Sequence, residues 1–164
     1  MKQLWAPWRM LYIEGAKENE CIFCTKPKDP DPRASLVLGQ TPHSVVMLNK
    51  YPYNNGHLLV APKRHARDFC ALSGPEYADL NRLLKQSVEI VYRALSPGGI
   101  NLGMNLGHCA GAGVEDHLHW HVVPRWEGDT NFMPVIGEVR VIPEHLAASY
   151  DRLRTFFEDL LREK

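Results

Sequence analysis

The chain has 164 residues, 45% of them hydrophobic and 23% charged, a composition typical of a globular protein that fits one domain. Lysine plus arginine number 19, as do aspartate plus glutamate, so no net positive charge favours a polynucleotide or a membrane surface. No apolar stretch could span a bilayer, and the first residues lack the apolar region of a signal peptide. We therefore expect a cytoplasmic protein whose four cysteines serve metal binding or packing rather than disulfides.

The first predicted elements are three short strands. They are expected at residues 35–38, 44–48 and 57–61, after an exposed loop rich in proline and charge at residues 26–33. The second and third strands are separated by residues 49–56, a segment full of turn-forming residues. A link of this length favours antiparallel pairing of the two strands.

A long helix is expected next. Ser73 and Glu76 have the spacing of a capping box, and apolar residues then recur at helical spacing as far as Leu95. This pattern predicts a helix of about six turns. Two further strands are expected at residues 100–105 and 117–123, joined by a glycine-rich loop.

The end of the chain is expected to hold a strand pair near residues 135–142 and a helix that begins at Pro143 or Glu144. One face of this helix carries Leu146, Tyr150, Leu153, Phe157 and Leu160. The order strands, helix, strands, helix predicts an α+β fold, an antiparallel sheet with one long central helix and a C-terminal helix.

The most informative segment is DHLHWHVVP at residues 116–124. On a strand, His117, His119 and His121 would share one face, about 6.6 Å apart successively, with apolar residues on the other. Imidazole is a nucleophile near neutral pH and also exchanges protons, so one histidine could attack phosphorus while another protonates the leaving oxygen. Surface histidines or a three-histidine metal site are the alternatives, although collinear positions do not easily converge on one ion.

Three glycines, Gly107, Gly111 and Gly113, lie just before this segment. Glycine lets backbone N–H groups approach a ligand closely, so the loop predicts an anion-binding nest for phosphate. A simple hairpin connection is the alternative.

These residues resemble the histidine triad (HIT) family, whose signature is three histidines alternating with apolar residues and followed by two apolar residues. The sequence HLHWHVV at residues 117–123 satisfies it fully. The sequence GHLLVAPKRH at residues 56–65 is similar to the family's second conserved strand, and residues 105–111 are similar to its loop. The motifs LWAPWR and PRWEGDTNF look like a prokaryotic branch near the fragile histidine triad proteins, which includes diadenosine tetraphosphate phosphorylases and hydrolases.

The resemblance implies a single HIT-type domain over residues 1–164. Its core would span residues 21–126, with an N-terminal extension at residues 1–20 and a C-terminal extension with a helix at residues 127–164. By the same resemblance we expect a homodimer whose ligand is a mononucleotide or a dinucleoside polyphosphate. The balanced charge and the lack of a long apolar stretch predict no polynucleotide or membrane partner.

The resemblance also implies an activity, the cleavage of dinucleoside polyphosphates such as diadenosine tetraphosphate by a phosphorylase or a hydrolase. His119 would attack the α-phosphorus and form a covalent nucleotidyl-histidine. His121 and His57 would bind phosphate oxygens or assist proton transfer, and Asn105 would hydrogen-bond near the phosphates. A nucleoside phosphoramidase uses the same covalent step, and a nucleotide sensor without turnover is a further alternative.

A nucleotide pocket follows from the same resemblance. Asn49 would hold the ribose, and the base would lie against Phe23, Met47 and Leu59. The phosphates would contact Gly111, Ala112 and Gly113. The three apolar residues could equally be ordinary core. Fragile histidine triad hydrolases carry glutamine at the position of Ala112. The side chain of Ala112 cannot contact phosphate, and this difference favours phosphorolysis over hydrolysis.

Cys21 and Cys24 form a C-x2-C motif, half of a tetrahedral zinc site. In zinc-bearing relatives and in galactose-1-phosphate uridylyltransferases, the other ligands correspond to His65 and His117. Such a closed site would be structural and would take no part in the chemistry, and two buried free thiols are the alternative. The cysteines that match no pattern are expected to be packing residues: Cys70 and Cys109.

Overall fold

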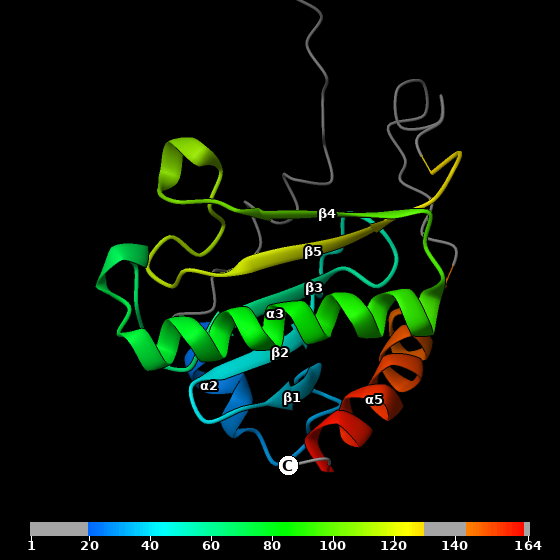
Figure 1. The fold of residues 1–164 in the computed structure, drawn as a ribbon, viewed down its shortest axis with the longest axis horizontal. Coiled ribbons are helices and arrows are strands. Elements are labelled where there is room, and N and C mark those ends of the chain that lie inside the picture. The colour runs from blue at the N-terminus through cyan, green and yellow to red at the C-terminus, as the bar shows by residue number, and fades with distance from the viewer. Residues whose placement is uncertain (1–19, 130–143, 163–164) are drawn as a thin grey trace, which may run out of the picture.

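A computed structural model describes residues 20–129 and 144–162. Five strands form one antiparallel sheet in the order β1-β2-β3-β5-β4 (Figure 1). The strands are β1 (Val37–Gln40), β2 (Ser44–Leu48), β3 (Leu58–Pro62), β4 (Gly99–Met104) and β5 (Trp120–Arg125). Within these residues no helix has the length and apolar character needed to cross a membrane.

Two long helices pack on the sheet, which confirms the α+β architecture. In the described residues the helices are α2 (Ile22–Thr25), α3 (Gly74–Leu95) and α5 (Leu146–Arg162), and the 3-10 turns are η1 (Lys26–Lys28), η2 (Phe69–Ala71) and η3 (His108–Ala110). Figure 1 shows α3 running across one face of the sheet, with α5 beside its end and next to β1.

The predicted capping box starts α3. The backbone N–H of Ser73 donates to the Glu76 carboxylate at 2.9 Å, and the Glu76 N–H donates back to the Ser73 hydroxyl at 3.4 Å. The Arg64 guanidinium also donates to this carboxylate, and together with Ser73 it lowers the pKa of Glu76 to about 2. The helix ends at Leu95, as predicted, because Ser96 takes a left-handed conformation with φ of 48°.

The sheet separates two apolar clusters, because alternate side chains of a strand point to opposite faces. On the α3 face lie Val46, Leu48, Leu58 and Val60, packed with helix residues such as Leu83. The residues on the opposite face are Val45, Met47, Leu59 and Ala61, together with Val37 and with Phe23 from α2. We call this second face the site face, since the triad histidines lie on it.

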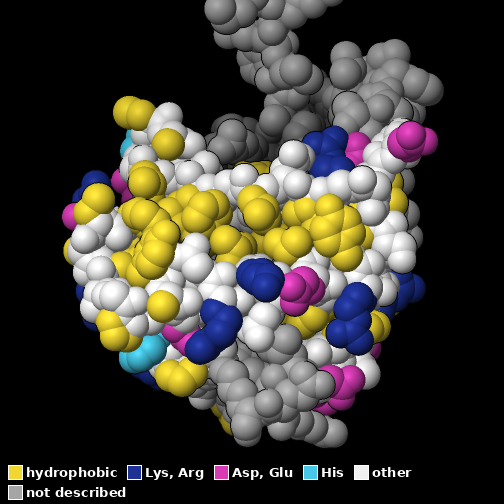
Figure 2. All heavy atoms as spheres, viewed as in Figure 1, with side chains coloured by type: hydrophobic (Ala, Val, Ile, Leu, Met, Phe, Trp, Pro, Cys, Tyr) yellow, Lys and Arg dark blue, Asp and Glu magenta, His cyan; other side chains and the backbone are white. Residues whose placement is uncertain are grey.

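The two edges of the sheet differ. At β1 the backbone carbonyls are used by α5, because the Tyr150 hydroxyl donates to the Val37 oxygen at 3.0 Å and Arg154 donates to the Leu38 oxygen at 2.6 Å. At the β4 edge Leu102 is 48% exposed. It lines a shallow groove with α3 side chains that include Leu84, Val88 and Tyr92. Figure 2 shows the corresponding band of hydrophobic side chains over α3 and β4.

Several predicted boundaries were wrong by two or three residues. The first strand begins at Val37 because Leu36 has a φ of 62°, which interrupts the extended chain. Strand β5 begins at Trp120 instead of residue 117, because the Leu118 N–H donates to the Ala66 oxygen, outside the ladder with β3. Helix α5 begins at Leu146, and the predicted strand pair at residues 135–142 lies outside the described residues.

Gly56 offers a test of this packing. Its φ is 69°, and a Cβ there would collide with the Leu95 side chain at the end of α3. Gly56→Ala should therefore lower the free energy of unfolding by about 1–3 kcal/mol in chemical denaturation. Gly74→Ala is the matched control, because a Cβ there meets nothing within 4 Å. Equal stability of the two variants would contradict the tight approach of Gly56 to Leu95.

Candidate active site

The alternation predicted for the histidine segment is present. Leu118 and Val122 are buried in the cluster under α3, and Trp120 packs against it. His117 and His119 are 0% and 5% exposed on the site face. The ring of Phe23 lies against both, with centroid distances of 5.0 Å to His117 and 4.9 Å to His119. The row of histidines is therefore an enclosed group rather than the polar surface of an amphipathic strand.

The protonated nitrogen of His119 is fixed by the backbone. Its Nδ1 lies 2.9 Å from the carbonyl oxygen of His117. A carbonyl oxygen only accepts hydrogen bonds, so Nδ1 carries the proton and Nε2 of a neutral ring keeps its lone pair. Burial is the main cause that lowers the pKa of His119, so the ring is neutral at pH 7. This is the state that a nucleophilic imidazole requires.

His57 and His121 form a second histidine pair. His57 precedes β3, and the pairing of Leu59 with His121 brings the two rings together, with the His57 Nε2 3.0 Å from the His121 Nδ1. The backbone N–H of Tyr53 donates to the His57 Nδ1 at 3.0 Å. The proton of neutral His57 therefore lies on Nε2, from which it donates to His121.

The same reasoning fixes the tautomer of His121. Because its Nδ1 accepts from His57, neutral His121 carries its proton on Nε2. Burial and the neighbouring His119 lower the pKa of His121 to about 4. His119 and His121, with ring centroids 4.9 Å apart, thus offer a lone pair and an N–H donor side by side. That combination suits attack on an electrophilic centre while an adjacent oxygen receives a hydrogen bond.

Four predicted metal ligands come together at the other end of the histidine row. The ligand atoms of Cys21, Cys24, His65 and His117 all lie within 4.8 Å of one another. The Nδ1 of His117 is 3.2 Å from the Cys21 sulfur, and the Nδ1 of His65 is 3.3 Å from the Cys24 sulfur. Tetrahedral bonds of zinc length place ligand atoms about 3.3–3.8 Å apart, so the spacing suits a zinc ion.

The donor set also fits zinc chemically. The His117 Nε2 lies 2.8 Å from the Pro62 oxygen, so it holds the proton and the Nδ1 lone pair faces the two thiols. Burial and the adjacent Cys21 raise the pKa of Cys24, because two thiolates this close repel each other without a cation between them. Two sulfurs and two neutral imidazole nitrogens are a common zinc set.

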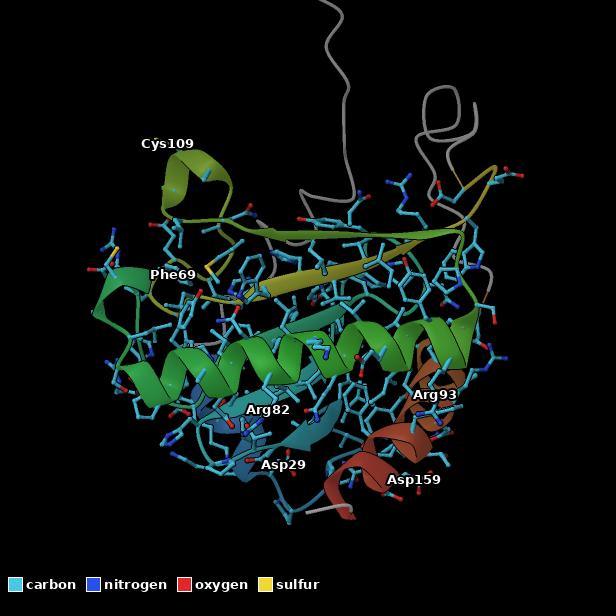
Figure 3. All side chains as sticks on the ribbon, viewed as in Figure 1. Asp29, Phe69, Arg82, Arg93, Cys109 and Asp159 are labelled. Atoms are coloured by element: carbon cyan, nitrogen blue, oxygen red, sulfur yellow. The ribbon has the colours of Figure 1, made fainter. Side chains whose placement is uncertain are left out.

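The other two cysteines lie away from this cluster. Cys70 and Cys109 are exposed, so the prediction that they are packing residues was wrong. Figure 3 shows Cys109 at the tip of the loop that projects beyond the sheet. Their positions are on the short turns η2 and η3, which offer no interior to pack against.

The predicted base-wall residues are buried together. Phe23, Met47 and Leu59 are 1%, 2% and 6% exposed, and all belong to the cluster on the site face. They therefore serve as core in this structure, and contact with a base stays a prediction. Asn49, predicted at the ribose, lies near the His57 Nδ1, with 3.3 Å between the amide nitrogen and the ring.

The predicted phosphate loop is closed by its own hydrogen bonds. The amide of Gly111 donates to the His108 oxygen at 2.8 Å, and that of Ala112 donates to the Gly107 oxygen at 3.4 Å. The Asn105 side chain donates to the Gly111 oxygen at 3.2 Å. Asn105 thus supports the loop, while phosphate contacts by Asn105, Ala112 and Gly113 stay predictions.

Sequence reasoning missed the backbone groups that fix the imidazole tautomers. These are the N–H of Tyr53 and the carbonyl oxygens of Pro62 and His117. A backbone group has no side-chain signature, so only the register of the strands could have pointed to it. The contact of Phe23 with His119 was also missed, although its position between Cys21 and Cys24 hints at it.

The HIT domain family model matches residues 33–128, more than half of the chain. The AP-4-A phosphorylase of Mycobacterium tuberculosis is 37% identical over 154 residues, which are 89% of this chain and 79% of that protein. Adenosine 5'-monophosphoramidase hnt1 of Schizosaccharomyces pombe is 36% identical over 105 residues, 64% of this chain and 74% of that protein. Among solved structures, a Zn-bound histidine triad family protein from Mycobacterium smegmatis gives a TM-score of 0.68 at 26% identity, covering 88% of this chain and 98% of that one.

The chain therefore belongs to the histidine triad family, as its sequence motifs predicted. The five-stranded antiparallel sheet with its helices is the fold of that family. The two relatives named above carry the names of enzymes that act on nucleotides, which supports nucleotide hydrolase or transferase activity as the general class.

Proposed function

We propose that this protein cleaves dinucleoside polyphosphates through a covalent nucleotidyl intermediate on His119. The carrying observation is the hydrogen bond from the His119 Nδ1 to the His117 oxygen, which leaves Nε2 as the nucleophile. The name of the mycobacterial relative, AP-4-A phosphorylase, supports diadenosine tetraphosphate as the substrate to test first.

In the first step, the Nε2 lone pair of His119 attacks the α-phosphorus. A nitrogen–phosphorus bond forms, and the bond to the bridging oxygen breaks so that this oxygen leaves with the electron pair. The Nε2–H of His121 donates to the leaving oxygen, and His57 holds His121 in the required orientation. With diadenosine tetraphosphate the leaving group is ATP, and adenylyl remains on His119.

In the second step, inorganic phosphate attacks the adenylyl phosphorus and the bond to His119 breaks, which releases ADP. We favour phosphate over water because Ala112 stands where fragile histidine triad hydrolases carry glutamine. Water in place of phosphate would give AMP. A nucleoside phosphoramidase would use the same covalent step, and the name of the Schizosaccharomyces pombe relative supports this alternative. A sensor without turnover has no need of the His119 and His121 pair.

Product analysis tests the proposal. Diadenosine tetraphosphate with phosphate should yield ATP and ADP, and omission of phosphate should suppress turnover.

His119→Asn should lower the rate at least about a thousandfold because the nucleophile is lost, while substrate binding stays within a few-fold by calorimetry. His43→Asn is the matched control, since this exposed histidine lies in the β1–β2 turn and should keep the wild-type rate. AMP and ATP without phosphate would instead establish a hydrolase, and full activity of His119→Asn would refute the covalent step.

We further propose that Cys21, Cys24, His65 and His117 hold one structural zinc ion. Zinc bound there would tie the segment before β1 to the end of β3 and to the histidine row, and a closed four-ligand site supplies no open position for substrate. The cluster geometry and the Zn-bound relative support this assignment.

Metal analysis tests the zinc site. The purified protein should contain about one zinc per chain by elemental analysis. Cys21→Ser should lose the metal and lower the melting temperature by about 5 °C or more, because metal binding stabilises the folded state. Cys109→Ser removes an exposed thiol and should change neither quantity. A wild-type protein that contains no zinc and has the same melting temperature as Cys21→Ser would contradict the proposed zinc site.

The homodimer expected from the family has a candidate surface at the β4 edge. An exposed strand edge beside the apolar groove of Leu84, Val88 and Leu102 can pair with the same edge of a second copy across a two-fold axis. Leu102→Glu should convert the dimer to a monomer in light scattering after gel filtration. Thr155→Glu, on the exposed side of α5, is the control. A monomeric wild type at tens of micromolar would contradict this proposal.

A further inference from the structure

Phe23 lies where the metal cluster and the candidate nucleophile meet. It stands between Cys21 and Cys24 in sequence, and its side chain is 1% exposed on the site face. Its ring centroid is 5.0 Å from that of His117, a cluster residue, and 4.9 Å from that of His119. One aromatic ring therefore contacts a candidate metal ligand and the candidate nucleophile together.

The turn that carries Phe23 has little support of its own. Helix α2 spans four residues, and Cys21 at its N-cap makes no side-chain capping bond. A single helical turn is unstable in isolation, because nucleation fixes several residues for very few hydrogen bonds. Phe23 and Ile22 pack on the cluster of the site face, and the two thiols that flank Phe23 would fasten this turn further when they share a metal ion with His65 and His117.

His117, by contrast, is held without any metal. Its Nε2 donates to the Pro62 oxygen at 2.8 Å, and the N–H of Leu118 donates to the Ala66 oxygen at 2.8 Å. Leu118 is also 2% exposed in the core under α3. Loss of the metal would leave this backbone and its bond to His119 in place, whereas α2 would lose two of its attachments.

We infer that the metal site and the nucleotide site are energetically coupled through Phe23, which is a positioning residue for His119. This inference rests on the zinc ion and the nucleotide site proposed above. A bound ion at Cys21 and Cys24 keeps the Phe23 ring against His119, and a nucleoside monophosphate bound at His119 keeps that ring, and with it α2, in place. Such coupling is reciprocal: bound nucleotide must raise the affinity for the metal by the same factor by which bound metal raises the affinity for the nucleotide.

The test measures how fast zinc leaves the folded, metal-loaded protein. Zinc transfer to an excess of a colorimetric chelator is followed with and without saturating AMP, after calorimetry has established the AMP affinity of each variant. Because AMP would act on the metal by holding α2 against the bound ion, its effect falls on the release rate, and a coupling of ordinary size should slow zinc release by about fivefold or more in the wild type. In Phe23→Ala, which keeps all four ligands, saturating AMP should leave the rate unchanged.

Phe69→Ala provides the matched control. Phe69 is a partly buried aromatic residue of η2 that packs on the cluster of the α3 face, whereas Phe23 lies in the cluster of the opposite face, so this variant should keep the wild-type response to AMP. Equal zinc release with and without AMP in the wild type, or an undiminished effect in Phe23→Ala, would overturn the coupling alone. Absence of zinc from the purified protein would overturn both the coupling and the zinc site. Failure to bind AMP would overturn both the coupling and the nucleotide site.

Discussion

The hydrogen bond between the His119 Nδ1 and the His117 carbonyl oxygen is the constraint on which the candidate active site depends. It joins two residues on either side of Leu118, so it depends on the backbone conformation at Leu118. Leu118 is held in the core under α3, where it is 2% exposed, and its N–H donates to the Ala66 oxygen. The protonation state of the candidate nucleophile thus depends on the burial of its neighbour on the opposite face of the sheet.

This link explains why a two-faced sheet suits the chemistry. One face packs against α3 and fixes the backbone, and the other holds His117, His119 and His121, whose pKa values are lowered by burial. Buried imidazoles without defined hydrogen bonds could take either tautomer, so nucleophile and donor could exchange roles. The backbone groups of Tyr53, Pro62 and His117 remove that ambiguity.

The sequence allowed most of the architecture to be predicted, because the signals were local. The capping box of Ser73 and Glu76 and the alternating histidines depend on neighbours in the chain, and α3 and the two-faced segment appear as predicted. The metal ligands were grouped by family resemblance, since 41 residues separate Cys24 from His65 and no spacing rule joins them. The predicted start of β5 was wrong because its pairing with β3 stops at Val60, two residues before β3 ends, and the Leu118 N–H donates to the Ala66 oxygen instead. The exposure of Cys70 and Cys109 likewise depends on which turns have a surface to pack against.

The triad histidines have three different environments despite their identical spacing. His117 turns its Nδ1 to two thiols, His119 turns its Nδ1 to a carbonyl, and His121 turns its Nδ1 to another imidazole. Where the partner of Nδ1 is a hydrogen-bond donor, the proton of the neutral ring lies on Nε2. Where that partner is an acceptor, Nδ1 carries the proton and Nε2 keeps its lone pair. The partner of one atom in each ring thus suits each histidine to a different one of the proposed roles of metal ligand, nucleophile and hydrogen-bond donor. Three histidines of one motif can take different proposed roles because the fold supplies a different partner to each.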